Sequence, residues 1–530
     1  MKSVIARKRV AYWSRTTKRG VLALVLALGV GATGAWAQVV ESPITAAQVK
    51  DAVDQLDGLV ETAMTETGVP GLAVAVVYQG KILFAKGYGV REAGKPERID
   101  ADTVFQIASL SKPVSASVVA HQVGSGVVSW DDSVQQYLPW FQLQDSWVSE
   151  HVSIGDFFAH RSGLPDHAGD DLEDIGYGRQ YILEHLKHLP LGAFRNTYAY
   201  TNFGLTAGAE AVATASGVDW ASLAENTLYA PLGMASTSSR FDDFMAQDNR
   251  AVSHTIVGGM FEPIAQRMPD PQSPAGGVST SVADFSRWMI MLLSQGRYDG
   301  KVIIEEEALT PALTPQVISR HPATPVESAS FYGFGTNVAT QASGRTMLSH
   351  SGAFTLGVGT NYMMLPSEEL GIAVFTNAAP VGAAESITAQ FMDLVQYGEV
   401  QREWLAGYQQ LFAQMTSPLG ELLGQQRPKN SEPSVDLELL EGEYDNAYFG
   451  PAKIQQNDAT LVLTLGPNEQ TFEVQHWAGD VFYFPVFTEN MPSGSVSSLT
   501  FDVSGDGVVR SMTVEFLNEY GLAVFNRQGR

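Results

Sequence analysis

Strand-like runs at both ends of a long helix-rich segment constrain what this 530-residue chain can fold into. Two apolar runs, 72–78 and 81–85, flank Gln79-Gly80, a turn pair that predicts a β-hairpin. Strand-like runs return only near residue 350. The predicted elements are a helix over 44–67, the hairpin, a middle rich in Ala, Leu and Ser, strands at 347–349, 360–365 and 370–376, and a helix over 383–411. This order predicts an α+β fold, an antiparallel sheet covered by helices.

The sequence changes character after residue 415. Residues 416–435 are rich in Pro, Gly, Gln and Ser, which is typical of a linker. Residues 436–530 alternate short strand-like runs with turns, which predicts a small all-β barrel or sandwich. The predicted domains are therefore 44–415 and 436–530.

The first 37 residues have the order of a secretory signal. Seven basic residues and no acid precede an apolar stretch from Val21 to Val30, and Ala35-Trp36-Ala37 follows as a cleavage site. The apolar stretch is too short to span a membrane. We therefore expect a periplasmic or secreted protein, cleaved near Ala37.

Composition excludes several classes of function. Removal of the signal takes away seven of the 33 basic residues and none of the 57 acids, so the formal charge falls from −24 to −31. Such an acidic protein is not expected to bind nucleic acid. The chain has no cysteine, which excludes disulfides, thiolate catalysis and Cys-ligated metals. No nucleotide, flavin or heme signature is present, so no cofactor is predicted.

Ser109 and Lys112 form the only Ser-x-x-Lys in the chain. Three residues make about one helical turn, so the two side chains share a face. Apolar neighbours and Pro113 predict a buried helix start, where desolvation lowers the pKa of a lysine and lets its amine activate a serine. The pair alone has a plainer interpretation, a helix-capping serine followed by a solvated lysine.

Three further stretches favour the catalytic interpretation of the pair. They are Tyr198 to Gly204, with Tyr200 and Asn202; Phe157 to Pro165; and Leu348 to Gly352, with His350. In this order the chain resembles the class C β-lactamase and penicillin-binding-protein superfamily of serine hydrolases over roughly residues 50–400. That superfamily includes esterases, D-aminopeptidases, D,D-peptidases and β-lactamases. The C-terminal β domain resembles the lipocalin-like modules often appended to it.

The resemblance implies a role for each matching residue. Ser109 is the nucleophile that forms an acyl-enzyme, Lys112 holds or removes its proton, and Tyr200 passes a proton to the leaving group. We expect cations near Tyr200 to lower the pKa of its phenol. Among the substrate-binding residues, Asn202 contacts the acyl side chain, and His350 and Gly352 lie on a strand beside the substrate. The N–H groups of Ser109 and Ala353 form the oxyanion hole.

The third motif departs from β-lactamases, which carry Lys-Thr-Gly where this chain has His350-Ser351-Gly352. A permanent cation that pairs with a substrate carboxylate is thereby replaced by a group that is largely neutral at pH 7. We therefore favour hydrolysis of a small ester, amide or peptide, in the manner of an esterase or D-aminopeptidase. The alternatives are a β-lactamase or D,D-peptidase, and a non-catalytic penicillin- or peptide-binding sensor.

Two histidines outside these motifs have plainer interpretations. His160 is interpreted as a buried structural residue at a helix end. An acidic, solvated loop explains the cluster at Asp166, His167, Asp170 and Asp171 as well as a metal site does, and no metal is predicted.

Overall fold

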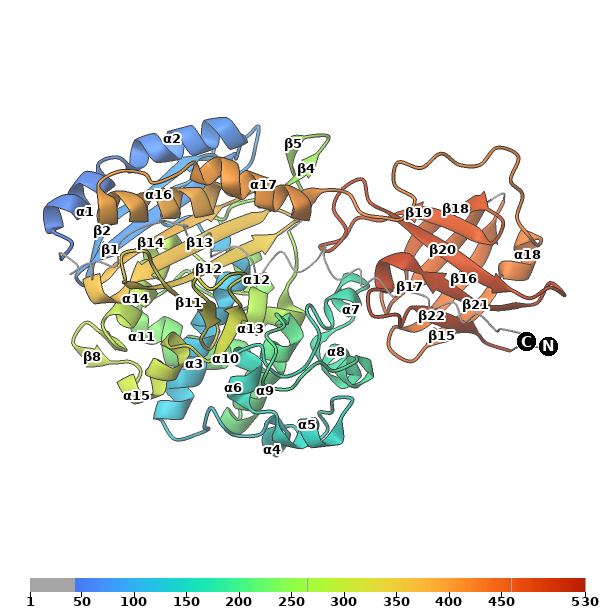
Figure 1. Ribbon diagram of the computed structural model, residues 1–530, viewed down its shortest axis with the longest axis horizontal. Helices are drawn as coiled ribbons and strands as arrows, with labels where there is room; N and C mark the ends of the chain where they lie inside the picture. The colour runs from blue at the N-terminus through green and yellow to red at the C-terminus, as the bar shows by residue number, and fades with distance from the viewer. Residues whose placement is uncertain (1–42, 265, 459, 530) are drawn as a thin grey trace, which may run out of the picture.

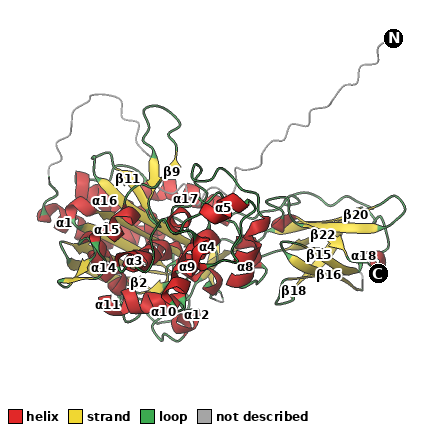
Figure 2. Ribbon diagram, turned by 90° about the horizontal axis from the view of Figure 1, so that it is seen from below, coloured by secondary structure: helices red, strands yellow, loops and turns green. Residues whose placement is uncertain are grey.

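The computed structural model describes residues 43–264, 266–458 and 460–529. The predicted signal, residues 1–37, lies outside them. Figure 1 shows a sheet-and-helix body joined to a β-barrel at one end, and Figure 2 shows the barrel projecting from the body in a second view. In the described part of the chain, no helix has the length and apolarity needed to cross a membrane.

An eight-stranded antiparallel sheet forms the centre of the body, in the order β2-β1-β14-β13-β12-β11-β10-β9. The fold class predicted from the sequence is confirmed. The strands are β1 (Gly71–Tyr78), β2 (Lys81–Gly89), β9 (Val317–Arg320), β10 (Ser330–Tyr332), β11 (Asn337–Thr340), β12 (Thr346–Phe354), β13 (Val358–Leu365) and β14 (Leu370–Thr376).

The central strands are apolar on both faces because helices cover both faces. Along β1, Leu72, Val74 and Val76 pack into one core, and the alternating alanines and Val77 pack into the other. The edge strand β2 is largely exposed. The turn between them has positive φ at Gln79 (49°) and Gly80 (71°), as the predicted hairpin requires.

Four helices cover one face of the sheet: α1 (Ala46–Val53), α2 (Leu56–Thr67), α16 (Ala383–Tyr397) and α17 (Trp404–Thr416) (Figure 1). The sequence predicted a single helix over 44–67, and this was wrong: the Gln55 side chain donates to the carbonyl of Asp51 where the two pieces meet. The single helix predicted over 383–411 was also wrong, because Gly398 adopts φ 78° and ends α16.

The other face is covered by α14 (Val282–Leu293) and the helical segment that carries the candidate site. Its helices are α3 (Ser111–Gly124), α4 (Val134–Tyr137), α5 (Ser146–His151), α6 (Ile154–Phe158), α7 (Asp170–Asp174), α8 (Arg179–His185), α9 (Asn202–Ser216), α10 (Trp220–Ala224), α11 (Ala230–Leu232), α12 (Phe241–Met245), α13 (Ser273–Gly276) and α15 (Glu306–Leu309). Short ladders pair β3 (Phe105–Gln106) with β6 (Ser279–Thr280), β4 (His254–Val257) with β5 (Met260–Pro263) and β7 (Arg297–Tyr298) with β8 (Lys301–Val302).

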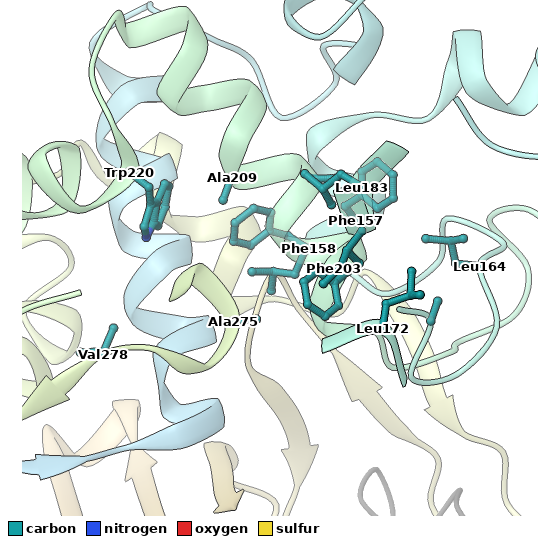
Figure 3. Close-up of a cluster of buried hydrophobic side chains, with 14 of the residues drawn as sticks. Phe157, Phe158, Leu164, Leu172, Leu183, Phe203, Ala209, Trp220, Ala275 and Val278 are labelled. Carbon is teal, nitrogen blue, oxygen red and sulfur yellow. The ribbon is translucent and has the colours of Figure 1, made fainter. Parts of the chain in front are cut away.

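An apolar core holds these helices together beneath the site. Phe157 and Phe158 of α6, Phe203 of α9 and Leu172 of α7 are fully buried and lie close together in Figure 3. Burial of each such side chain contributes about 1.5–3 kcal/mol. The starts of α7 and α9 are therefore held in a rigid setting.

The C-terminal domain is a closed eight-stranded barrel, preceded by α18 (Leu437–Leu440). Its strands are β15 (Gly442–Asn446), β16 (Gly450–Asn457), β17 (Thr460–Leu465), β18 (Gln470–Ala478), β19 (Val481–Pro485), β20 (Val496–Val503), β21 (Val509–Val514) and β22 (Val524–Arg527). Along β17 every second residue is buried, and these side chains, Leu461, Leu463 and Leu465, fill the barrel interior. Of the two β architectures predicted, the structure has the barrel.

Candidate active site

Ser109 lies in a tight turn at the start of α3. A 3₁₀ turn, Ala108–Leu110, leads directly into the helix, and Ala108 has φ 48°, a region that non-glycine residues rarely occupy. Ser109 is 6% exposed and Lys112 is completely buried. The Nζ atom of Lys112 lies 3.1 Å from Oγ of Ser109, as the three-residue spacing predicted.

Burial lowers the pKa of Lys112 well below its usual value, although the charge of Asp170 acts in the opposite direction. Besides Ser109, its amine contacts two acceptors, Oδ1 of Asn202 at 2.7 Å and the carbonyl of Ala275 at 3.0 Å. In its neutral form the amine has two N–H donors and one lone pair. The two acceptors can then take both donors, which leaves the lone pair for the Ser109 hydroxyl.

Tyr200 donates a hydrogen bond of 2.7 Å from its phenol to Oγ of Ser109. Burial raises the pKa of Tyr200, and the hydrogen bond to Ser109 acts in the opposite direction. The sequence-based expectation of a lowered pKa is wrong, because desolvation of the buried phenol dominates and the charges of Asp170 and Asp166 also raise its pKa. The phenol is therefore protonated and donates to the nucleophile.

Asn202 begins α9, one residue after its N-cap, Thr201. Its Oδ1 faces Lys112, and its Nδ2 donates to both carboxylate oxygens of Asp170, at 2.9 and 3.2 Å. Asp170 is 6% exposed and also pairs with Nδ1 of His167 at 2.8 Å. The sequence predicts an acidic, solvated loop here, whereas Asp170 is buried; the three-residue spacing of His167 and Asp170 is the one local signal of their pairing.

Strand β12 lies against the nucleophile turn. A Cβ on Gly352 would lie 2.3 Å from the carbonyl oxygen of Ile107 and 3.1 Å from the backbone nitrogen of Ser109. Only glycine allows this approach. Ala353, the next residue, lines the pocket above Ser109.

His350 lies on the same strand, with both ring nitrogens engaged. Nδ1 lies 2.7 Å from the carbonyl oxygen of Ser351, and Nε2 lies 2.9 Å from the hydroxyl of Tyr332. Burial and the neighbouring Lys112 lower the pKa of His350 to about 3. The ring is therefore neutral. Its predicted role in substrate binding stays a prediction.

His160 is buried near these groups without contacting Ser109. Its Nδ1 accepts from the backbone N–H of Thr201 at 3.2 Å, and its ring lies 4.6 Å from that of Tyr200. Within the described residues, no group of three or more His, Asp or Glu is arranged to hold a metal ion. The His167–Asp170 pair instead binds Asn202.

A pocket opens on Ser109, and both domains line it. The body contributes Asp170, Asn202, Ala353 and Phe354, among others, and α17 contributes Gln414 and Met415. The barrel side contributes Glu489, Asn490, Met491, Phe516 and Tyr520. None of these barrel residues is predicted from the sequence, because no local pattern connects them with a serine nearly 400 residues earlier.

Glu489 joins the barrel to the rim of the site. Its carboxylate accepts from the backbone N–H of Thr355 at 2.8 Å and of Leu356 at 3.3 Å, in the turn after β12. Arg267 lies between Glu489 (3.4 Å) and Glu173 (2.6 Å), with its guanidinium 4.2 Å from the ring of Phe354. Burial raises the pKa of Glu489 to about 7, against the effect of Arg267.

The family model described as beta-lactamase matches residues 56–396, and a second, described as a domain of unknown function (DUF3471), matches residues 426–526. The first covers more than half of the chain, which therefore belongs to the beta-lactamase family. This is a family of serine hydrolases, so the protein is a hydrolase.

Two relatives differ in how much of the chain they match. The unguisins hydrolase ungD' of Aspergillus campestris is 25% identical over 431 residues, covering 76% of this chain and 78% of the relative. Protein flp of Staphylococcus aureus (strain MRSA252) is 22% identical over 343 residues, covering 62% and 63%.

Two solved structures share the fold. The octameric penicillin-binding protein homologue from Pyrococcus abyssi superposes with a TM-score of 0.58 at 17% identity, covering 89% of this chain and 99% of that one. A class C β-lactamase mutant superposes with a TM-score of 0.55 at 20% identity, covering 65% and 97%.

Proposed function

We propose that the protein hydrolyses esters or amides through an acyl-enzyme on Ser109. The contacts of Lys112 carry the proposal: two acceptors occupy its N–H groups, and the lone pair of a neutral amine is directed at the serine hydroxyl. Lys112 takes the Ser109 proton as Oγ attacks the carbonyl carbon. Tyr200, already bonded to Oγ, then passes a proton to the leaving group.

In this proposal the N–H groups of Ser109 and Ala353 bind the oxyanion. The close approach of Gly352 to the nitrogen of Ser109 supports this, because it brings the two backbone segments together. Asn202 lines the pocket, which supports its predicted contact with the acyl side chain of the substrate. In the second half of the cycle the Tyr200 phenolate takes a proton from the attacking water, and the Lys112 ammonium returns its proton to Oγ as the bond between Oγ and the acyl carbon breaks.

The pocket favours substrates without a free carboxylate. His350 replaces the lysine of β-lactamases and is neutral, and the cation of Arg267 is paired with Glu173 and Glu489. A carboxylate would therefore find no unpaired cation among these groups, whereas a neutral ester or amide needs none. Likeness to a class C β-lactamase in fold keeps β-lactam hydrolysis as the second candidate.

We also propose export, on the basis of the basic and apolar order of residues 1–37. Amino-terminal sequencing of the protein from a periplasmic or culture fraction should begin at Gln38. A start at Met1 in the cytoplasmic fraction alone would contradict it.

The test is a burst assay of residues 38–530 on a p-nitrophenyl ester, a D-alanine p-nitroanilide and a chromogenic cephalosporin. Ser109→Ala should lose the burst, with turnover reduced by at least about 10³-fold. Ser286→Ala, which removes another buried hydroxyl that does not line the pocket, is the matched control and should retain the burst. Undiminished turnover by Ser109→Ala would refute the mechanism. Ser109-dependent labelling by fluorescent penicillin without turnover would instead indicate a sensor.

A further inference from the structure

Asp170 is a buried carboxylate that makes no contact with Ser109 or Lys112, yet it bonds a residue that does. It begins α7, and its two oxygens accept from Nδ2 of Asn202 at 2.9 and 3.2 Å. Nδ1 of His167 lies 2.8 Å from one of these oxygens. The charges of Asp166 and Asp170 raise the pKa of His167 to about 9, overcoming the effect of burial, so the imidazole is protonated and donates to Asp170 at neutral pH.

These bonds determine which way the Asn202 amide points. An ionised carboxylate accepts hydrogen bonds and cannot donate, so the NH₂ group of Asn202 must face Asp170 and its oxygen must face Lys112. With the amide reversed, its oxygen would meet the carboxylate, and its NH₂ group would meet the Lys112 amine. The lone pair of Lys112 would then be drawn toward Asn202 and away from Ser109.

We propose that Asp170 is a positioning residue: it holds the Asn202 amide in the one orientation that leaves the lone pair of Lys112 directed at Ser109. The inference rests on the proposed role of Ser109 and adds the residues that orient its base, Lys112. His167 in turn holds Asp170, so the chain of contacts runs from His167 through Asp170 and Asn202 to Lys112.

The charge of Asp170 also acts on Lys112. Four other groups face this amine or influence it: Tyr200, Arg267, and the two neutral imidazoles of His160 and His350. The charge of Asp170 raises the pKa of Lys112, and the charge of Arg267 lowers it. Loss of the Asp170 charge should therefore move the acid limb of the pH–rate profile, where Lys112 becomes protonated, to lower pH.

The test measures kcat, KM and the pH–rate profile of Asp170→Asn with a p-nitrophenyl ester. An asparagine here no longer dictates the orientation of Asn202. We expect kcat to fall about 10- to 100-fold, with little change in KM. This is the size of effect seen when a residue that only orients a functional side chain is lost. The acid limb should move to lower pH. Asp170→Glu keeps the charge and both acceptors, so it should recover part of kcat and the acid limb of the wild type.

Asp284→Asn is the matched control. Asp284 lies in the first turn of α14 and is also 6% exposed, but its carboxylate accepts from the N–H and hydroxyl of Ser236 and does not line the pocket. It should lower the melting temperature and leave the pH–rate profile in place. An equal loss of kcat in Asp284→Asn, or a wild-type kcat and acid limb in Asp170→Asn, would overturn the inference.

The two proposals fail in different ways. A burst that persists in Ser109→Ala refutes the proposed function itself. A burst that depends on Ser109, together with a kcat and acid limb unchanged by Asp170→Asn, refutes only the role of Asp170. If Asp170→Asn does not fold, Asp170→Glu alone is the test. A loss of kcat with the wild-type acid limb of the pH–rate profile supports the positioning role of Asp170. An unchanged kcat with a displaced acid limb overturns that role.

Discussion

Lys112 shows how position changes the chemistry of one residue. An exposed lysine is a cation at neutral pH, but this side chain is completely buried, and desolvation lowers its pKa. The apolar residues around Ser109 made that outcome predictable from the sequence. The raised pKa of Tyr200 was not predictable, because it depends on the full burial of the phenol and on the charges of Asp170 and Asp166, which only the fold brings near it.

At the same scale, His167 should make stability depend on pH. Burial alone would lower its pKa, but Asp166 and Asp170 raise it to about 9, above the unfolded value near 6.5. The protonated imidazole therefore contributes stability fully below pH 6.5, and this contribution is lost as pH rises through 9. We expect the melting temperature to fall between pH 7 and pH 10, measured by circular dichroism.

The control is His167→Gln, which keeps an N–H donor for Asp170 but has no charge to lose. Its melting temperature should depend less on pH over this range. Parallel pH profiles for the two proteins would contradict the assignment.

At the scale of elements, β12 packs so closely against the Ser109 turn that position 352 has no room for a side chain. A Cβ there would meet the backbone of Ile107 and the hydroxyl of Thr360, each at 2.3 Å. Gly352→Ala should push the strand away from Ser109 and lower kcat/KM by about 100-fold, since small displacements at the reacting atoms are costly. Steady-state kinetics on the preferred substrate measures this.

Gly58→Ala is the paired control for this substitution. Gly58 lies within α2, where nothing stands within 4 Å of an added Cβ. It should raise the free energy of unfolding by up to about 1 kcal/mol and leave kcat/KM unchanged. Equal activity of the two variants would show that β12 does not need the close approach.

The helices show which elements a one-dimensional pattern can predict. The apolar spacing correctly indicated helical structure near 44–67 and 383–411. It did not reveal that each helix is interrupted, at Gln55 and at Gly398. Both breaks are local backbone events, a side-chain bond to a carbonyl and a left-handed residue, and they leave the apolar periodicity nearly intact. The hairpin at 71–89 was predicted well because its turn chemistry is itself local.

At the scale of the whole molecule, the barrel forms one wall of the active-site pocket. Partly buried polar contacts hold it there, among them Tyr448 donating to Asp171 at 2.8 Å and Thr488 donating to Asp174 at 2.7 Å. Both acceptors lie on α7, the helix that begins with Asp170. The same helix therefore carries the barrel contacts and the residue that holds Asn202.

The barrel wall should limit the size of the substrate. Met491 is 2% exposed and lines the pocket, so Met491→Ala enlarges it. We expect the ratio of kcat/KM for a p-nitrophenyl octanoate to that for the acetate to rise about tenfold, since each buried methylene contributes about 0.8 kcal/mol. The measurement is the ratio itself, which is independent of the active fraction of the preparation.

Met512→Ala removes the same side chain from the barrel interior, where Met512 is fully buried and does not line the pocket. It should destabilise the barrel by about 2–5 kcal/mol without changing the ratio. A similar ratio in both variants would show that the pocket wall does not select for chain length.

The sequence by itself determined the fold class, the nucleophile turn and the family, because these depend on patterns within a few residues. Ser109 and Lys112 are three residues apart, and a helical turn brings them together wherever it forms. Tertiary structure alone decided the partners of this pair. Asp170 is 32 residues from Asn202, and Glu489 is 134 residues from Thr355. Such pairs meet only because apolar cores pack their helices and strands together, and side-chain packing has no signature in one dimension.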